Sequence, residues 1–91
     1  MRFDKAFDKA RLDAWLAELT RASGENLFRF KGILAIAGDD RRYVLQGVHR
    51  LVDLHSADPW GARQPSSKLV FIGRGLDAAV LKAGLARCLA G

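Results

Sequence analysis

The sequence predicts an α+β domain in which two helices pack on one face of an antiparallel sheet of three to four strands. Residues 8–23 and 77–89 carry apolar side chains at helical spacing, and the segments between them alternate with the period of two that is typical of strands. The chain has 91 residues. A chain of this length buries only roughly 60–65% of the surface that it exposes when unfolded, so we expect one domain over residues 1–91.

The first helix is expected over residues 8–23. Its apolar stripe consists of residues at three- and four-residue spacing, namely Leu12, Trp15, Leu16 and Leu19. Asp8 is a suitable N-cap, and Phe7 before it can pack on Leu12 as a hydrophobic staple. Gly24 is expected to end the helix as a C′ glycine.

The second helix repeats this design with Asp77 as the N-cap and Leu76 and Leu81 as the staple pair. Its expected buried face consists of Val80, Leu81, Gly84, Leu85, Cys88 and Leu89. Both helices therefore need an apolar surface on which to lie.

Three strands are expected between the helices: one around residues 28–31, one over residues 43–51 and one over residues 68–73. Arg2 and Phe3 are interpreted as the stub of a fourth strand. The polar, glycine-containing segment 37–41 is short enough to join the first two strands as a hairpin. Residues 54–66 contain both prolines and are expected to form a long loop.

The strand alternation predicts a candidate interaction surface. If the aromatic and leucine side chains of the strands face the helices, the opposite face has an apolar centre and a basic rim. The residues inferred to face the helices are Phe28, Phe30, Tyr43, Leu45, Leu69 and Phe71. Those inferred to face away are Arg29, Lys31, Gln46, Val48, Arg50, Lys68, Val70, Ile72 and Arg74. Exposed aliphatic side chains on such a face indicate burial against another domain or subunit, the alternative being a few tolerated surface aliphatics.

No catalytic, cofactor-binding or metal-binding residue is predicted. The chain lacks a G-x-x-x-x-G-K-[ST] phosphate loop and a C-x-C-C cluster, and Cys88 is its single cysteine. On one strand His49 and Asp53 would lie roughly 13 Å apart at ~3.3 Å per residue, too far to hold one metal ion. His49 is interpreted as a hydrogen-bonded residue at the rim of the core, with a partner contact or a metal ligand as alternatives. Trp60 is expected to cover the core edge or to contact a partner.

The net charge of +5, from 15 Lys and Arg and 10 Asp and Glu, favours an acidic partner, a nucleotide or nucleic acid. The longest uncharged apolar stretch is far shorter than the ~18–20 residues of a membrane span, so no membrane partner is expected. A reducing cytoplasm is the expected location, since one cysteine excludes an internal disulfide.

Four segments together resemble the C-terminal domain of the CobW-type GTPases, which act as metallochaperones. They are Lys31-Gly32, Arg42 to His49, Pro59-Trp60 and Ser67 to Asp77. The resemblance implies that the chain is one piece of a longer protein, and that His49 and Trp60 belong to the family pattern. It also implies that the parent binds GTP, magnesium and zinc or cobalt.

By this resemblance, the chain is a non-catalytic interaction and regulatory domain of a GTPase that delivers metal or supports cobalamin synthesis. Its expected partners are the N-terminal GTPase domain of the same parent chain, a metal-requiring client, or a second copy of itself. The alternative is a small RNA- or single-strand-binding module, which would need aromatic side chains on the open face of the sheet. The phenylalanines are expected to point inward, which makes nucleic acid the weaker hypothesis.

Overall fold

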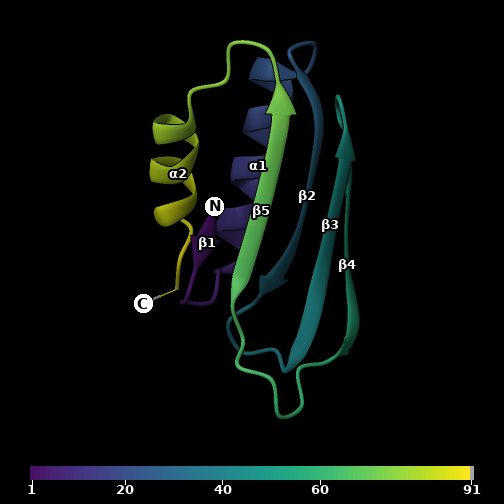
Figure 1. The fold of residues 1–91 in the computed structure, drawn as a ribbon, viewed down its shortest axis with the longest axis vertical. Coiled ribbons are helices and arrows are strands. Elements are labelled where there is room, and N and C mark those ends of the chain that lie inside the picture. Colours follow the sequence, from purple (N-terminus) through teal and green to yellow (C-terminus); the bar gives the residue numbers. More distant parts are fainter. Residues whose placement is uncertain (91) are drawn as a thin grey trace.

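The computed structural model describes residues 1–90 and confirms the α+β class (Figure 1). The elements in chain order are β1 (Arg2–Phe3), α1 (Lys9–Ser23), β2 (Leu27–Ala35), β3 (Arg41–Val48), β4 (Leu51–Pro59), β5 (Ser67–Gly73) and α2 (Ala78–Ala86). The strands form one antiparallel sheet in the order β1-β5-β2-β3-β4. Both helices cover the same face of this sheet, which leaves the other face open (Figure 1).

The core lies between the helices and the covered face of the sheet. Its fully buried side chains include Phe7, Leu12, Phe30, Leu34, Leu45, Leu69 and Leu85. The two helices meet where the indole of Trp15 lies against Gly84, and a Cβ atom at that glycine would collide with the indole nitrogen. Among the described residues, neither helix is long and apolar enough to cross a membrane.

The first helix matches its prediction except at its end. The carboxylate of Asp8 accepts a hydrogen bond from the backbone N–H of Arg11 at 3.1 Å, as an N-cap should. Gly24 is not a left-handed C′ glycine, because its φ is −50°. A Cβ atom there would lie 2.5 Å from Cγ of Arg50 and 2.6 Å from the carbonyl oxygen of Thr20. The glycine is therefore explained by close packing and not by an unusual backbone conformation.

The second helix begins as predicted, because Asp77 accepts hydrogen bonds from the backbone N–H groups of Ala79 and Val80. The prediction that Val80 is buried is wrong, since this side chain is 64% exposed. Successive residues of a helix are about 100° apart, so a helix that buries Leu81, Gly84 and Leu85 turns Val80 toward solvent.

The expected loop over residues 54–66 is wrong in its first half, and the sheet has five strands where three to four were expected. The chain reverses at His49 and Arg50, and β4 then returns along β3 from the pair Val48↔Leu51 to the pair Tyr43↔Ser56. His49 adopts a left-handed conformation with φ of 54°. Because this turn contains no glycine, the alternation of residues 43–51 by itself predicts one continuous strand.

Phe28 was expected to face the helices, and this is also wrong because its side chain is 39% exposed. The pairing of β2 with β5 shifts register between Leu27 and Arg29, which is the irregularity that a β-bulge produces. Leu27 and Phe30 point inward on either side of it. The Phe28 ring instead lies edge-on to His49, with 6.2 Å between the ring centroids.

Candidate interaction surface

The open face of the sheet, called the outer face below, is built from three rows of residues that lie opposite one another on neighbouring strands. Directly paired residues share a face, so the pairings of β5, β2, β3 and β4 define the rows. The rows are Ile72-Arg29-Val48-Leu51, then Val70-Lys31-Gln46-Asp53, then Lys68-Ile33-Val44-His55.

The centre of the outer face is apolar and exposed. Val48 and Val70 are each 48% exposed, and Ile72 is 54% exposed. Leu51, at 77% exposure, extends this apolar area onto β4. Sequence reasoning missed Leu51 because β4 itself was not predicted. Exposed aliphatic side chains in contiguous positions are typical of a surface that another protein covers.

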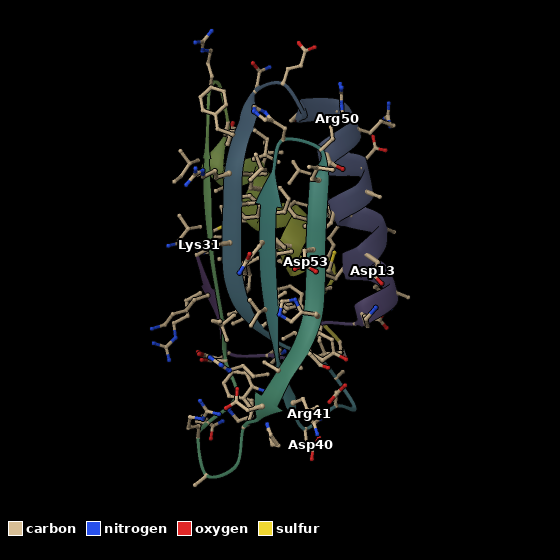
Figure 2. All side chains as sticks on the ribbon, turned by 90° about the vertical axis from the view of Figure 1, so that its right-hand side faces the viewer. Asp13, Lys31, Asp40, Arg41, Arg50 and Asp53 are labelled. Atoms are coloured by element: carbon tan, nitrogen blue, oxygen red, sulfur yellow. The ribbon has the colours of Figure 1, made fainter. Side chains whose placement is uncertain are left out.

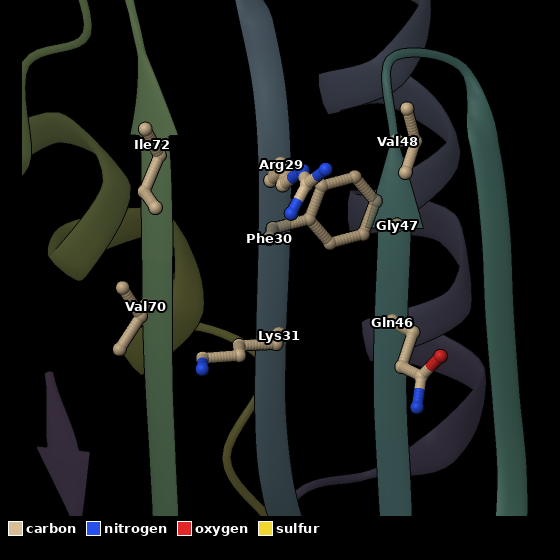
Figure 3. Close-up of a pocket in the computed structure, with 8 residues that line it drawn as sticks. All are labelled: Arg29, Phe30, Lys31, Gln46, Gly47, Val48, Val70 and Ile72. Carbon is tan, nitrogen blue, oxygen red and sulfur yellow. The ribbon is translucent and has the colours of Figure 1, made fainter.

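A shallow depression of about 280 Å³ lies on the outer face between β5, β2 and β3 (Figure 3). Its lining consists of Arg29, Phe30, Lys31, Gln46, Gly47, Val48, Val70 and Ile72. The ring of Phe30 reaches toward β3 and occupies the space beside Gly47, where any Cβ atom would overlap three ring carbons (Figure 3). The glycine thus allows a phenylalanine to close the covered side of the sheet at this point.

Charge is unevenly spread over the outer face. Basic residues lie on β2 and β5, where Lys31 projects away from α1 (Figure 2), and Arg2 of β1 pairs with Lys68. On β4, Asp53 bonds His55 with 3.1 Å between Oδ2 and Nδ1. The outer face is therefore basic on one side of its apolar centre and carries a carboxylate on the other.

Lys68 lies in the third row of the outer face, and six of the nine residues inferred to face away from the helices line the depression together: Arg29, Lys31, Gln46, Val48, Val70 and Ile72. Arg50 does not, because it belongs to the turn and lies over Gly24 at the end of α1. A cation is favourable there, since the carboxyl end of a helix carries partial negative charge. Arg74 follows β5 and is exposed, and its backbone N–H donates to the carbonyl of Asn26 at 2.8 Å.

His49 is hydrogen-bonded as expected, although it lies in a turn and not on a strand. Its Nδ1 is 3.2 Å from the carbonyl oxygen of Gly24, so Nδ1 must carry the proton because a carbonyl only accepts. The side chain links the β3–β4 turn to the end of α1. Asp53 lies on β4 and bonds His55, so His49 and Asp53 do not lie on one strand as the sequence predicted.

Trp60 does not belong to the main core cluster, so its expected role as a core cover is not the one that the structure shows. It begins the β4–β5 loop, where its backbone N–H donates to Asp40 at 2.9 Å and its ring lies 5.9 Å from the Arg63 guanidinium. Its indole Nε1 is buried without a hydrogen-bond partner in residues 1–90.

Asp58 holds this loop against β3. Its carboxylate accepts hydrogen bonds from Arg63 at 2.7 Å and from Arg42 at 2.8 Å. These two guanidinium groups lower the pKa of Asp58 to about 2. The ion pairs are exposed, so their value is mainly to orient the loop.

Cys88 is a buried thiol, and burial raises its pKa. A raised pKa disfavours the thiolate form that binds metal. Within the described part of the chain, no three His, Cys, Asp or Glu side chains are grouped so that they could hold a metal ion.

Comparison with known proteins identifies relatives over nearly the whole chain. Residues 1–89 match the family model described as the cobalamin synthesis protein CobW C-terminal domain. The chain is 34% identical over 86 residues to the zinc chaperone YjiA of Escherichia coli K12, and 38% identical over 80 residues to the zinc chaperone CobW of Pseudomonas aeruginosa. These alignments cover 94% and 81% of this chain but only 27% and 21% of the two relatives.

The crystal structure of the Zn(II)-bound YjiA GTPase from Escherichia coli superposes with a TM-score of 0.93 at 32% identity. It matches over 99% of this chain and 28% of its own length, and a triple mutant of the same protein gives the same values. The family match and the identity to the relatives therefore lead to one conclusion: this chain belongs to the family of CobW C-terminal domains, which are parts of zinc chaperone GTPases.

Proposed function

We propose that this chain is a non-catalytic interaction and regulatory domain that docks through its outer face onto the GTPase domain of a longer parent protein. The observation that carries the proposal is the exposed apolar centre on a sheet whose other face is already covered by both helices. A sheet face that met only water would be expected to carry polar side chains there.

The GTPase domain is the proposed occupant because the chain spans about a quarter of the relatives that it matches. In those relatives most of the chain lies outside the matching part, so a large partner surface is always present at high effective concentration. Arg29 and Lys31 beside the depression favour a docking surface that places carboxylates around an apolar contact.

The chemistry of the parent is proposed by family membership alone. The parent would bind GTP, magnesium and zinc or cobalt, and would deliver metal to a client protein or support cobalamin synthesis in the cytoplasm. In this domain the side chains of the types that bind metal ions have structural roles: Cys88 is buried, His49 bonds the end of α1, and Asp77 caps α2. We therefore assign the domain a role in holding or sensing the GTPase domain.

The nucleic-acid alternative is not favoured by the outer face. Its twelve paired positions on β5, β2, β3 and β4 contain no Phe, Tyr or Trp. Single-strand readers of this size stack bases on such side chains. Phe28 is exposed, but it lies at the bulge against His49 and not among these positions.

Two matched substitutions test the docking surface. The chain would be titrated against the separately produced GTPase domain of the parent protein, in its GTP and GDP forms, by isothermal calorimetry. Ile72→Lys places a charge in the apolar centre, and Val80→Lys places the same charge on an aliphatic position of α2 that is also exposed, at 64% against 54% for Ile72. We expect Ile72→Lys to weaken binding at least about tenfold, because the free-energy cost of removing a lysine from water exceeds the free energy that the aliphatic contact contributed.

Val80→Lys should leave the affinity within about threefold of the original chain. Equal losses in both variants would mean that docking depends on overall charge and not on the outer face. Binding that is unaffected by Ile72→Lys would refute the assigned surface. Absence of binding to the GTPase domain in either nucleotide form would refute the proposed function itself.

A further inference from the structure

The strand β4 is an open edge of the sheet. Within residues 1–90 it pairs with β3 only. Figure 2 looks directly onto this edge and shows no strand or helix lying over it, with α1 to one side. An edge strand of nine residues presents unpaired backbone groups to any other strand of suitable register.

The alternation of the hydrogen bonds identifies which residues of β4 present these groups. A two-residue turn joins Val48 to Leu51, so this closing pair exchanges backbone hydrogen bonds and the odd-numbered residues of β4 bond β3. Val52, Leu54 and Ser56 then direct their N–H and C=O groups outward. The same alternation holds across the sheet. The backbone N–H and C=O groups of Leu69 on β5 point away from β2, and each bonds the backbone of Met1 at 2.9 Å.

We propose that two copies of this chain associate by antiparallel pairing of their β4 strands, with Leu54 opposite the partner's Leu54. In this register Val52 lies opposite the partner's Ser56. The outward N–H and C=O groups of Val52, Leu54 and Ser56 therefore face complementary C=O and N–H groups of the partner strand. The bulge between the pairs of Tyr43 and Arg41, followed by Pro59, ends the pairing beyond Ala57. The contact is therefore short, and the dimer is weak.

Charge complementarity selects this register. It places Asp53 directly opposite the partner's His55 and, by symmetry, His55 opposite the partner's Asp53. These are non-hydrogen-bonded pairs, in which side chains of facing strands come closest. Within one copy, Nδ1 of His55 already bonds the carboxylate of Asp53 at 3.1 Å, and when the ring is protonated on both nitrogens its Nε2–H can donate to the partner's Asp53.

Other registers lose this match. Sliding one strand by two residues in either direction puts Asp53 opposite the partner's Asp53, or His55 opposite the partner's His55. Sliding one strand by one residue puts residues whose backbone groups point to the open edge opposite residues whose backbone groups bond β3, so the hydrogen-bond ladder between the two copies cannot form.

The covered side of the sheet also gains from this pairing. A cleft of about 440 Å³ lies between α1 and β4, lined by Leu16, Ala17 and Thr20 on the helix and by Val52 on the strand. Val52 is 40% exposed at this cleft. The partner's Ser56 and Leu54 would cover the cleft. The two-fold axis is perpendicular to the sheet, so all helices stay on one face and both outer faces remain open for the docking proposed above.

Charge swapping tests the dimer with sedimentation velocity over a wide concentration range. The original chain should show a reversible monomer–dimer equilibrium. His55→Asp converts both cross-strand pairs into like charges and should raise the dissociation constant by about tenfold or more. Adding Asp53→His to that variant restores opposite charges in the reversed order and should return the dissociation constant to within about threefold of the original.

A second pair of variants addresses the backbone. Ser56→Pro removes an outward N–H without removing a bond to β3 and should abolish the dimer, whereas Ser56→Ala should keep it. Circular dichroism would confirm that each variant is folded. A chain that is monomeric at every concentration would overturn the proposal. So would a dimer that tolerates His55→Asp, or one that is lost on Ile72→Lys, which would place the contact on the outer face.

Discussion

Replacing Gly47 by alanine is expected to destabilise the domain by about 1–3 kcal/mol, the usual cost of overpacking a core. A Cβ atom at this position would overlap Cζ, Cε1 and Cε2 of Phe30, whereas carbon atoms in contact are normally about 3.5–4.0 Å apart. The Phe30 ring cannot withdraw easily, because it is only 2% exposed and stacks on Phe71 with 6.0 Å between centroids.

The change would be measured by urea denaturation and by calorimetry. For a domain of this size each kcal/mol lowers Tm by about 4–8 °C. Phe30→Leu provides the matched control, since a smaller side chain leaves room for the new methyl group. In the Gly47→Ala background it should cost at least about 1 kcal/mol less than in the original chain.

Two results would refute this reasoning. One is a Gly47→Ala variant whose free energy of unfolding lies within about 0.5 kcal/mol of the original, which would mean that the sheet relaxes freely at this point. The other is simple additivity of the two substitutions, which would mean that the alanine acts elsewhere than on the Phe30 ring.

The remaining predictions concern charge, nucleotide, metal and the outer face. The pKa of Asp58 is lowered to about 2 from an ordinary value of 3.8, so its contribution to stability is complete above about pH 4 and is lost as the pH falls toward 2. Denaturation curves at several pH values should show this loss, and Asp58→Asn should remove it from that pH window; an unchanged acid profile would contradict the ion pairs to Arg42 and Arg63. The isolated chain should not hydrolyse GTP, because it has no phosphate loop, and turnover that disappears on mutating a residue of this chain would disprove this. Calorimetry should find no tight zinc or cobalt site, and a stoichiometric sub-micromolar site abolished by His49→Ala would be the contrary result. Val70→Lys should leave the folded monomer within about 0.5 kcal/mol of the original stability, since this side chain is outside the core; unfolding would show that the faces of β5 were assigned wrongly.

The local features of the chain were sufficient to determine the α+β class and the faces of the central strands. Asp8 and Asp77 identify the helix starts because an N-cap needs only its own side chain and the next backbone amides. The alternation around Lys31 and Val70 identifies the outer face because both sides of these strands are paired regularly. The motif spacing identified the family for the same reason, since it is a property of the order of residues.

Only the tertiary structure decided the features that depend on contacts between distant segments. The β3–β4 turn has no glycine, and the left-handed His49 is held there by the carbonyl of Gly24, which lies 25 residues earlier in the chain. Without that contact the sequence could not show where β3 ends, so β4, Leu51 and the place of Arg50 were all missed. Phe28 was misplaced because a bulge between β2 and β5 reverses the alternation. A period of two predicts the facing of a strand only while its ladder is regular, and each interruption of the ladder is set by packing across the sheet.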